Sequence, residues 1–339
     1  MTSRMARLIL RLLGFGTAFV VAGIITVWIL LLRPVDLSKN HSAAIKSGSS
    51  VVAAVKSINR QCPLPTPSLV SVVARLTARL TGRSVQRGWY RFMDGDTQVD
   101  VLMALFGSHR RPSIRVTIPE GLTYRDIAAI LARSIEADST AFVAWCESDT
   151  VLQTYGVAGR SMEGYLMPNT YTFYWRDDAQ VIGDKLAAEF KEQWVQHCEG
   201  ILAQSGRTAH DVITLASIVQ AEAAQVEEMP RIAGVYANRL ARAMRLEADP
   251  TVQYGRGERS RVLYKHLEHQ SPYNTYQVYG LPPGPICNVG LDALRAALQP
   301  EEHSYLFFVA RGDGSGGHYF AKTGAEHVTN VKRYRARRN

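Results

Sequence analysis

The chain has 339 residues, of which 46% are hydrophobic and 20% are charged. This length allows two domains with a sizeable core, and the composition is that of a globular protein apart from the N-terminus. The net charge of +9 favours an anionic partner, such as a membrane surface or an acidic polymer, although a solvated basic surface is the alternative. Because no basic block interleaved with aromatic residues occurs mid-chain, the sequence argues against nucleic acid as a partner.

An uncharged apolar segment from Leu12 to Leu32 is the first predicted element. As a helix it would cross a hydrocarbon core of about 30 Å. Arg4, Arg7 and Arg11 precede it, so the positive-inside rule places residues 1–11 in the cytoplasm and the rest of the chain outside. A cleaved signal peptide is the alternative, but its apolar region would normally be about 7–15 residues long. The sequence therefore predicts a single-pass cell membrane protein whose remaining domains are extracytoplasmic (periplasmic).

Residues 33–86 follow as a predicted linker and poorly defined region, and a small α+β unit follows over residues 87–136. Residues 87–92 and 114–118 alternate like short strands, residues 99–105 indicate a helix, and Thr123 is a suitable N-cap for another helix. This order resembles a LysM-like module, and such modules bind glycan chains. A spacer domain is the alternative.

The rest of the chain, residues 137–339, indicates a larger, helix-rich α+β domain. We expect a helix that carries Glu222, and Pro230 opens the next one. Residues 244–255 indicate an extended loop. Beyond Gly290 a helix to about Leu298 and a hairpin over residues 305–320 complete the domain. The predicted fold class is therefore α+β, with an N-terminal transmembrane helix and two extracytoplasmic domains of different size.

Glu222 occupies an unusual position in its helix. Apolar residues recur at helical spacing on one face: Leu215, Ile218, Val219 and Val226. Glu222 falls on this face, whereas Glu227 and Glu228 are expected on the solvated face. A carboxyl that faces a core should have a raised pKa unless it is paired, and a carboxylic acid that is protonated near neutral pH can act as a general acid. A paired structural glutamate is the alternative.

The cysteines and histidines give no metal-binding pattern. The cysteines are Cys62, Cys146, Cys198 and Cys287, far apart and without zinc-type spacing. All four follow the apolar segment, where an oxidising compartment would permit disulfides in any of three full pairings, and buried free thiols are the alternative. His266, His269 and His318 are expected at the surface or in loops. We therefore predict neither a metal site nor a cofactor.

Six motifs in a fixed order carry a family resemblance. They are Glu163-Gly164 with Asn169-Thr170, Ala216 to Glu222, Asn238-Arg239-Leu240, Met244-Arg245-Leu246 with Asp249 to Val252, Tyr273 to Tyr276, and Gly280 to Ile286. In this order they resemble the endolytic murein transglycosylases of the MltG (YceG-like) family. The predicted order of anchor, LysM-like subdomain and catalytic domain resembles that family too.

The resemblance implies a lytic transglycosylase of peptidoglycan. Such enzymes cleave the β-1,4 bond between N-acetylmuramic acid and N-acetylglucosamine inside a glycan strand and leave a 1,6-anhydro end. The family's catalytic glutamate corresponds to Glu222. Many members carry an acidic residue two positions earlier, where this chain has Gln220. Glycosidases usually need two carboxylates, but attack by the sugar's own hydroxyl requires only one acid/base.

Further residues are expected to bind substrate or orient Glu222: Glu163, Asn238, Asp249, Tyr254, Asn274 and Tyr276. The partners implied are glycan strands, the bilayer and, as candidates, peptidoglycan synthases or division proteins; the implied role is to terminate nascent strands. A hydrolytic muramidase is one alternative and would need a second carboxylate, for which Glu163 or Asp249 are candidates. A catalytically silent glycan-binding scaffold is the other.

Overall fold

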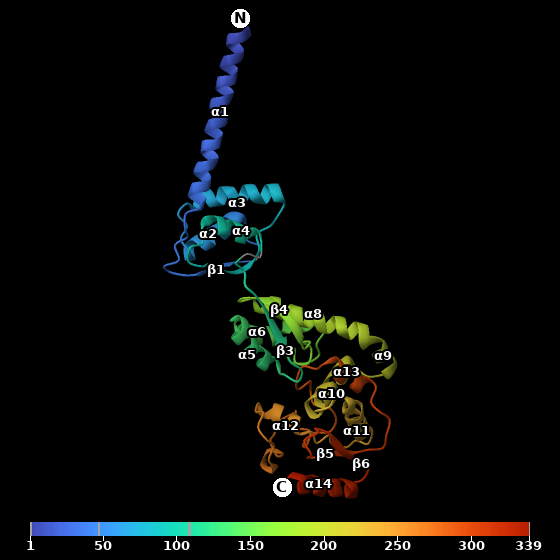
Figure 1. Ribbon diagram of the computed structural model, residues 1–339. Helices are drawn as coiled ribbons and strands as arrows, with labels where there is room; N and C mark the ends of the chain where they lie inside the picture. Colours follow the sequence, from blue (N-terminus) through green and yellow to red (C-terminus); the bar gives the residue numbers. More distant parts are fainter. Residues whose placement is uncertain (1, 47, 108–109, 339) are drawn as a thin grey trace. The chain divides into compact units, whose positions relative to one another are not determined.

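The computed structural model describes residues 2–46, 48–107 and 110–338, and the chain divides into two compact units. The first unit comprises Met1–Ile114 and Phe173–Asp177, and the second comprises Arg115–Thr172 and Asp178–Asn339. Both are mixed helix and strand, with helices predominating (Figure 1). The α+β class predicted from the sequence is therefore confirmed, whereas the division falls near residue 114 instead of residue 136.

Helix α1 (Thr2–Leu31) begins the first unit. Its segment Gly14–Leu31 has a mean hydropathy of 2.2 and is only 6% buried, so it is long and apolar enough to cross a membrane. The C-terminal end of this helix is held by the rest of the first unit. The Leu31 side chain is buried in that unit's core, and the Gln98 side-chain amide donates a hydrogen bond of 2.8 Å to the Leu30 carbonyl.

The remainder of the first unit is a strand, two helices, a strand and a helix. These are β1 (Ser42–Ile45), α2 (Val51–Gln61), α3 (Pro67–Thr81), β2 (Gly88–Arg91) and α4 (Gln98–Phe106). The two strands pair antiparallel, with Ser42 opposite Arg91, and α2 packs against both β1 and α3. Where the sequence suggested a linker over residues 33–86, the structure is folded, because Ala54, Val55 and Ile58 form a buried face on α2.

The first part of the second unit contains a two-stranded sheet and five helices. Its strands are β3 (Ser113–Ile118) and β4 (Asn169–Tyr174), each of which continues from one unit into the other. The helices are α5 (Tyr124–Ile135), α6 (Ser139–Cys146), α7 (Asp149–Tyr155), α8 (Ala179–His197) and α9 (Glu199–Ser205). The expected cap of α5 is confirmed, because the Thr123 side chain accepts a hydrogen bond from the Asp126 backbone N–H.

Helix α10 (Ala209–Glu222) is the central helix of the second unit (Figure 1). Its neighbours are α11 (Met229–Ala241), α12 (Asp249–Arg256) and α13 (Leu291–Leu298). Every residue from Val212 to Val219 is buried, so the helix has core on all sides and not on one apolar face. Its first turn, from Ala209 to Asp211, is partly exposed, and its last turn, which ends in Glu222, reaches the surface at the other end.

Two predictions around this helix are wrong. Val226 is 47% exposed, because α10 ends at Glu222 and Val226 begins the separate 3-10 turn η1 (Val226–Glu228). The second half of the expected loop over residues 244–255 is helix α12, in which Pro250 occupies the first turn, where its missing N–H costs nothing.

A hairpin and a terminal helix close the unit. Strands β5 (Phe307–Ala310) and β6 (His318–Ala321) pair antiparallel as predicted, and α14 (Gly324–Arg338) packs against them. A 3-10 turn, η2 (Tyr264–His266), lies earlier in the chain.

The expectation of a solvated Glu228 and a surface His318 is wrong. Both are buried, and His318 Nδ1 lies 2.7 Å from Glu228 Oε2, because the turn after α10 directs Glu228 inward.

Candidate active site

Glu222 lies at the C-terminal end of α10, where a buried helix reaches the surface. Its carboxyl is half-buried and accepts a hydrogen bond of 3.2 Å from the Tyr236 hydroxyl on α11. Burial, followed by the negative charge of Asp249, raises the Glu222 pKa to about 7, and the hydrogen bond from Tyr236 opposes this rise. A carboxyl with this pKa can both donate and accept a proton near neutral pH.

Asp249 and Tyr276 form the second part of this cluster. Asp249 is the first residue of α12, and its Oδ1 accepts a hydrogen bond of 2.8 Å from the Tyr276 hydroxyl. The loop that carries Tyr276 is held by Asn274, which is fully buried. The Asn274 amide donates to the carbonyls of Leu267 and His269 and its oxygen accepts from the Tyr276 N–H. Asn274 therefore contacts Tyr276 and the loop backbone.

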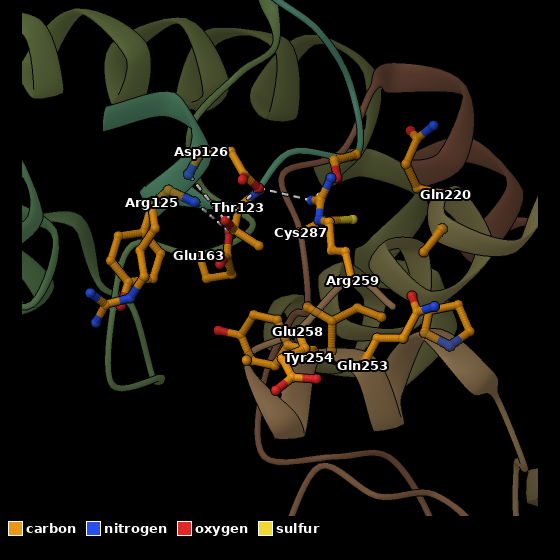
Figure 2. A pocket seen from close by; sticks show the side chains of 16 residues that line it. Thr123, Arg125, Asp126, Glu163, Gln220, Gln253, Tyr254, Glu258, Arg259 and Cys287 are labelled. Atoms are coloured by element: carbon orange, nitrogen blue, oxygen red, sulfur yellow. Dashed lines mark hydrogen bonds and ion pairs between the residues drawn. The ribbon is translucent and has the colours of Figure 1, made fainter. Parts of the chain in front are cut away.

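A cavity of about 600 Å³ opens beside the end of α10 (Figure 2). Its wall includes Gln220 and Ala221 of α10 and Tyr254 of α12. Glu222 is not among the lining residues, but it directly follows Ala221, and its neighbour Asp249 directly precedes Pro250, which also lines the cavity. The same two helix ends therefore form the cavity wall and the Glu222–Asp249 pair.

Glu163 provides a second carboxyl, on the cavity wall itself (Figure 2). Its side chain is only 2% exposed, and Oε1 accepts hydrogen bonds from the Tyr124 N–H (3.1 Å) and the Asn288 side-chain amide (2.8 Å). Burial raises its pKa to about 8, although the hydrogen bonds from Tyr124 and Tyr254 and the charge of Arg259 act in the opposite direction. This carboxyl is therefore mostly neutral at pH 7.

Two charged side chains form one edge of the cavity. Arg259 forms an ion pair of 2.9 Å with Asp126 and also donates to the Gly121 carbonyl (Figure 2). The Arg259 side chain is 55% exposed, so this cation is accessible to a ligand in the cavity. Tyr254 also lines the cavity, and the centroid of its ring lies 4.8 Å from that of the Tyr273 ring.

The residues proposed from the sequence fall into three places. Asp249 and Tyr276 lie with Glu222, and Glu163 and Tyr254 line the cavity. Asn238 is engaged elsewhere, since its amide donates to the carbonyls of His303 and Tyr305, ahead of β5.

Three residues of this region were not singled out as site residues from the sequence. Tyr236 contacts Glu222, and the Gln220 side chain accepts a hydrogen bond from the Gly290 N–H. Asn288 is fully buried; its oxygen accepts from the N–H groups of Gly164 and Leu166, and its amide donates to Glu163 and to the Leu122 carbonyl. In the sequence, Asn288 is marked only by its position shortly before Gly290, after which a helix was predicted. Among the described residues, no three His, Cys, Asp or Glu side chains lie where they could jointly hold a metal ion.

Comparison with known proteins agrees with this architecture. Residues 43–333 match the YceG-like family. The chain belongs to the YceG-like family. An endolytic murein transglycosylase of Bacillus subtilis is 30% identical over 328 residues, which cover 91% of this chain and 89% of that protein.

Two further similarities support membership of the YceG-like family. An endolytic murein transglycosylase of Streptococcus pneumoniae is 28% identical over 279 residues, 73% of this chain, and the match spans about half the length of that relative. The crystal structure of a putative YceG-like protein from Listeria monocytogenes superposes with a TM-score of 0.60 at 29% identity. It covers 85% of this chain and 98% of the Listeria chain.

Proposed function

We propose that this YceG-like protein is an endolytic lytic transglycosylase that cleaves the bond between N-acetylmuramic acid and N-acetylglucosamine within peptidoglycan strands. Relatives named endolytic murein transglycosylase support the reaction class. The observation that carries the proposal for this chain is Glu222. It is a half-buried carboxyl whose pKa is raised to about 7 at the end of a cavity-lining helix.

One carboxyl is sufficient for this reaction. The protonated Glu222 donates its proton to the leaving glycosidic oxygen, and the resulting carboxylate then accepts the proton of the muramic acid C6 hydroxyl as that oxygen attacks C1. The bond to the leaving sugar breaks, the 1,6-anhydro bond forms, and the proton balance is restored. Because the nucleophile is part of the substrate, neither an enzyme nucleophile nor a bound water is required.

The other site residues divide into those that support Glu222 and those that bind sugar. We assign Asp249 and Tyr276 to the first group, because Asp249 raises the Glu222 pKa and Tyr276 holds Asp249. Glu163 and Tyr254 belong to the second group, since both line the cavity. We assign Asn238 and Asn274 a structural role in holding loops, because their side-chain amides donate to backbone carbonyls.

The proposal also includes a location. The exposed apolar segment of α1 supports a single-pass membrane anchor, and the arginines before it support a cytoplasmic N-terminus with an extracytoplasmic (periplasmic) catalytic domain. An anchor of this kind would confine cleavage to strands near the bilayer and so suit termination of nascent strands. Peptidoglycan synthases and division proteins, which work at the same surface, are the candidate protein partners.

A glycan-binding, LysM-like role for the first unit is a further part of the proposal. The order of strand, two helices and antiparallel strand from β1 to β2 supports it. In this form the module would span residues 42–91 and not residues 87–136. A spacer between the membrane and the catalytic unit is the alternative role.

Digestion of purified peptidoglycan by the full chain in detergent tests the reaction. We expect muropeptides with anhydro ends in the mass spectrum, and their loss in Glu222→Gln. Glu227→Gln is the matched control, because Glu227 is an exposed carboxylate five positions further along the chain. Reducing muramic ends would favour a hydrolytic muramidase, and no product from the native chain would favour a silent glycan-binding scaffold.

A further inference from the structure

The two oxygens of the Glu163 carboxyl have different surroundings. Oε1 accepts two hydrogen bonds, from the Tyr124 N–H and the Asn288 amide. Oε2 is buried and has no hydrogen-bond partner of good geometry, although the Tyr254 hydroxyl is near enough to the carboxyl to lower its pKa. Because both strong donors converge on Oε1, a proton on this carboxyl belongs on Oε2.

The charged and titratable groups around Glu163 favour the neutral carboxylic acid. Asp126 contributes a negative charge that opposes ionisation. In the described part of the chain, the cation that faces Glu163 is Arg259, and Asp126 already pairs with it. The remaining titratable neighbours are Tyr254, Tyr273, Cys146 and Cys287, and burial raises the pKa of each, so all four are neutral at pH 7.

A neutral carboxylic acid on a cavity wall is a hydrogen-bond donor. In contrast, a carboxylate in the same place could only accept and would repel acceptor oxygens. Among the neutral groups of an N-acetylated sugar, the acetamido carbonyl is the strongest acceptor. The cavity, at about 600 Å³, has the size of ordinary ligand sites and is open to a sugar ring.

We propose that Glu163 binds substrate as a neutral acid, donating a hydrogen bond from Oε2 to the acetamido carbonyl of an N-acetylated sugar in the cavity beside Glu222 (Figure 2). The sugar class rests on the proposed function. The assignment gives Glu163 a role other than that of a second catalytic carboxylate. It also makes substrate binding depend on pH independently of the Glu222 titration.

Glutamine reproduces the arrangement that the proposal requires. In Glu163→Gln the amide oxygen can take the place of Oε1 and accept from Tyr124 and Asn288, and the amide N–H₂ can take the place of the protonated Oε2. The amide donates at every pH. Glu163→Ala removes the donor altogether and leaves the Asn288 amide without one of its acceptors.

Binding of N-acetylglucosamine tetramer to the full chain in detergent, measured by calorimetry between pH 6 and pH 9.5, tests the proposal. All proteins carry Glu222→Gln, so that no cleavage occurs and Glu222 does not titrate. We expect the affinity of the protein with Glu163 to fall about tenfold or more as pH rises through 8, because the binding-competent form becomes a minor one. The E163Q variant should keep its affinity across this range, and E163A should bind weakly throughout.

Three results would overturn the proposal. The first is loss of binding by E163Q at pH 6 to the level of E163A, which would mean that the carboxylate is the binding form. The second is the same pH dependence in E163Q as with Glu163, which would assign the titration to another group. The third is equal binding of cellotetraose, whose 2-hydroxyl replaces the acetamido group. Thermal unfolding of each variant verifies that it is folded.

These results are separable from the test of the proposed function. The binding measurement uses inactive protein and reports only on Glu163 and the sugar. If native chain fails to release anhydro ends while E163Q shows pH-independent binding, the reaction is wrong and the binding mode is supported. If anhydro ends appear but the affinity does not change with pH, the reaction is supported and the role of Glu163 is overturned.

Discussion

The Tyr236 hydroxyl donates a hydrogen bond of 3.2 Å to Glu222 Oε1, and the Tyr236 ring is buried between helix α11 and strand β5. The ring meets Phe308 edge-on at 5.8 Å between centroids. The proposed acid/base therefore has a rigid donor on a neighbouring helix. This hydrogen bond favours the charged form of Glu222, whereas burial and Asp249 favour the neutral form.

Tyr236→Phe should raise the pKa of Glu222 above its value of about 7. Glu222 must be protonated to act as the acid, so activity should fall as pH rises through its pKa. In Y236F this fall should occur at a pH that is higher by roughly half to one unit. The measurement is kcat against pH for release of anhydro ends. Tyr279→Phe, at an exposed tyrosine, is the control. An unshifted falling limb in Y236F would mean that the hydrogen bond does not influence the titration.

Asp249→Asn should have the opposite effect. Asparagine keeps an oxygen that can accept the Tyr276 hydroxyl proton but removes the charge that raises the Glu222 pKa. We expect the falling limb to move to lower pH and the activity at pH 7.5 to drop several-fold, because less Glu222 is protonated there. Asp292→Asn, at the first turn of α13, is a matched control for loss of an acidic residue near a helix start. A limb that moves upward in D249N would contradict this account.

Local signals in the sequence were sufficient for many elements of the fold. Thr123 caps α5, and alternating residues gave the β5–β6 hairpin. The 3-10 turn after Glu222 was missed, because the backbone leaves the helical conformation at Ala223 without a glycine or proline to mark the break. Continuing the helical period past that break placed Val226 inside and Glu228 outside, the reverse of what the structure has.

The site could be predicted only in part, for a related reason. Glu222 was identifiable because one segment of chain carries both its apolar neighbours and the family motif. Asn288 joins Leu122, Glu163 and Leu166 through contacts between segments more than a hundred residues apart, and such contacts leave no periodic trace in the sequence. Tyr236 could not be identified from the sequence for the same reason, because its hydroxyl meets Glu222 only through the packing of α11 against α10.

Gly164→Ala should unfold the protein more easily and displace Glu163. Gly164 has a φ of +85°, and a Cβ there would lie 2.6 Å from the Pro285 side chain and 2.9 Å from Ile213. Backbone strain of about 1–2 kcal/mol and overpacking of about 1–3 kcal/mol should add to roughly 2–5 kcal/mol of lost stability. Gly206→Ala is the matched control, since Gly206 has a φ of +66° with open space around it and should lose only the strain term. Urea unfolding measures both, and equal losses would show that the Pro285 contact relaxes without cost.

Loss of one partner from the buried pair of Glu228 and His318 should destabilise the second unit. His318 Nδ1 lies 2.7 Å from Glu228 Oε2, and the His318 N–H donates to Oε1 of the same carboxyl, so the pair joins the start of α11 to β6. His318→Leu leaves a buried carboxyl without its side-chain partner and should reduce the free energy of unfolding by about 3 kcal/mol. Glu227→Gln, at the exposed neighbour, should change it by less than about 0.5 kcal/mol.

A double-mutant cycle separates this pair from simple loss of packing. Glu228→Leu combined with His318→Leu removes both polar groups, and we expect the double variant to be more stable than His318→Leu alone, because no carboxyl then remains buried and unpaired. Urea unfolding at pH 7.5 of the native chain, the two single variants and the double variant measures the four free energies of the cycle. If the double variant instead lost the sum of the two single losses, the pair would have no mutual coupling. The stability would then come from the packing of His318 against Phe308, whose rings meet edge-on at 5.3 Å.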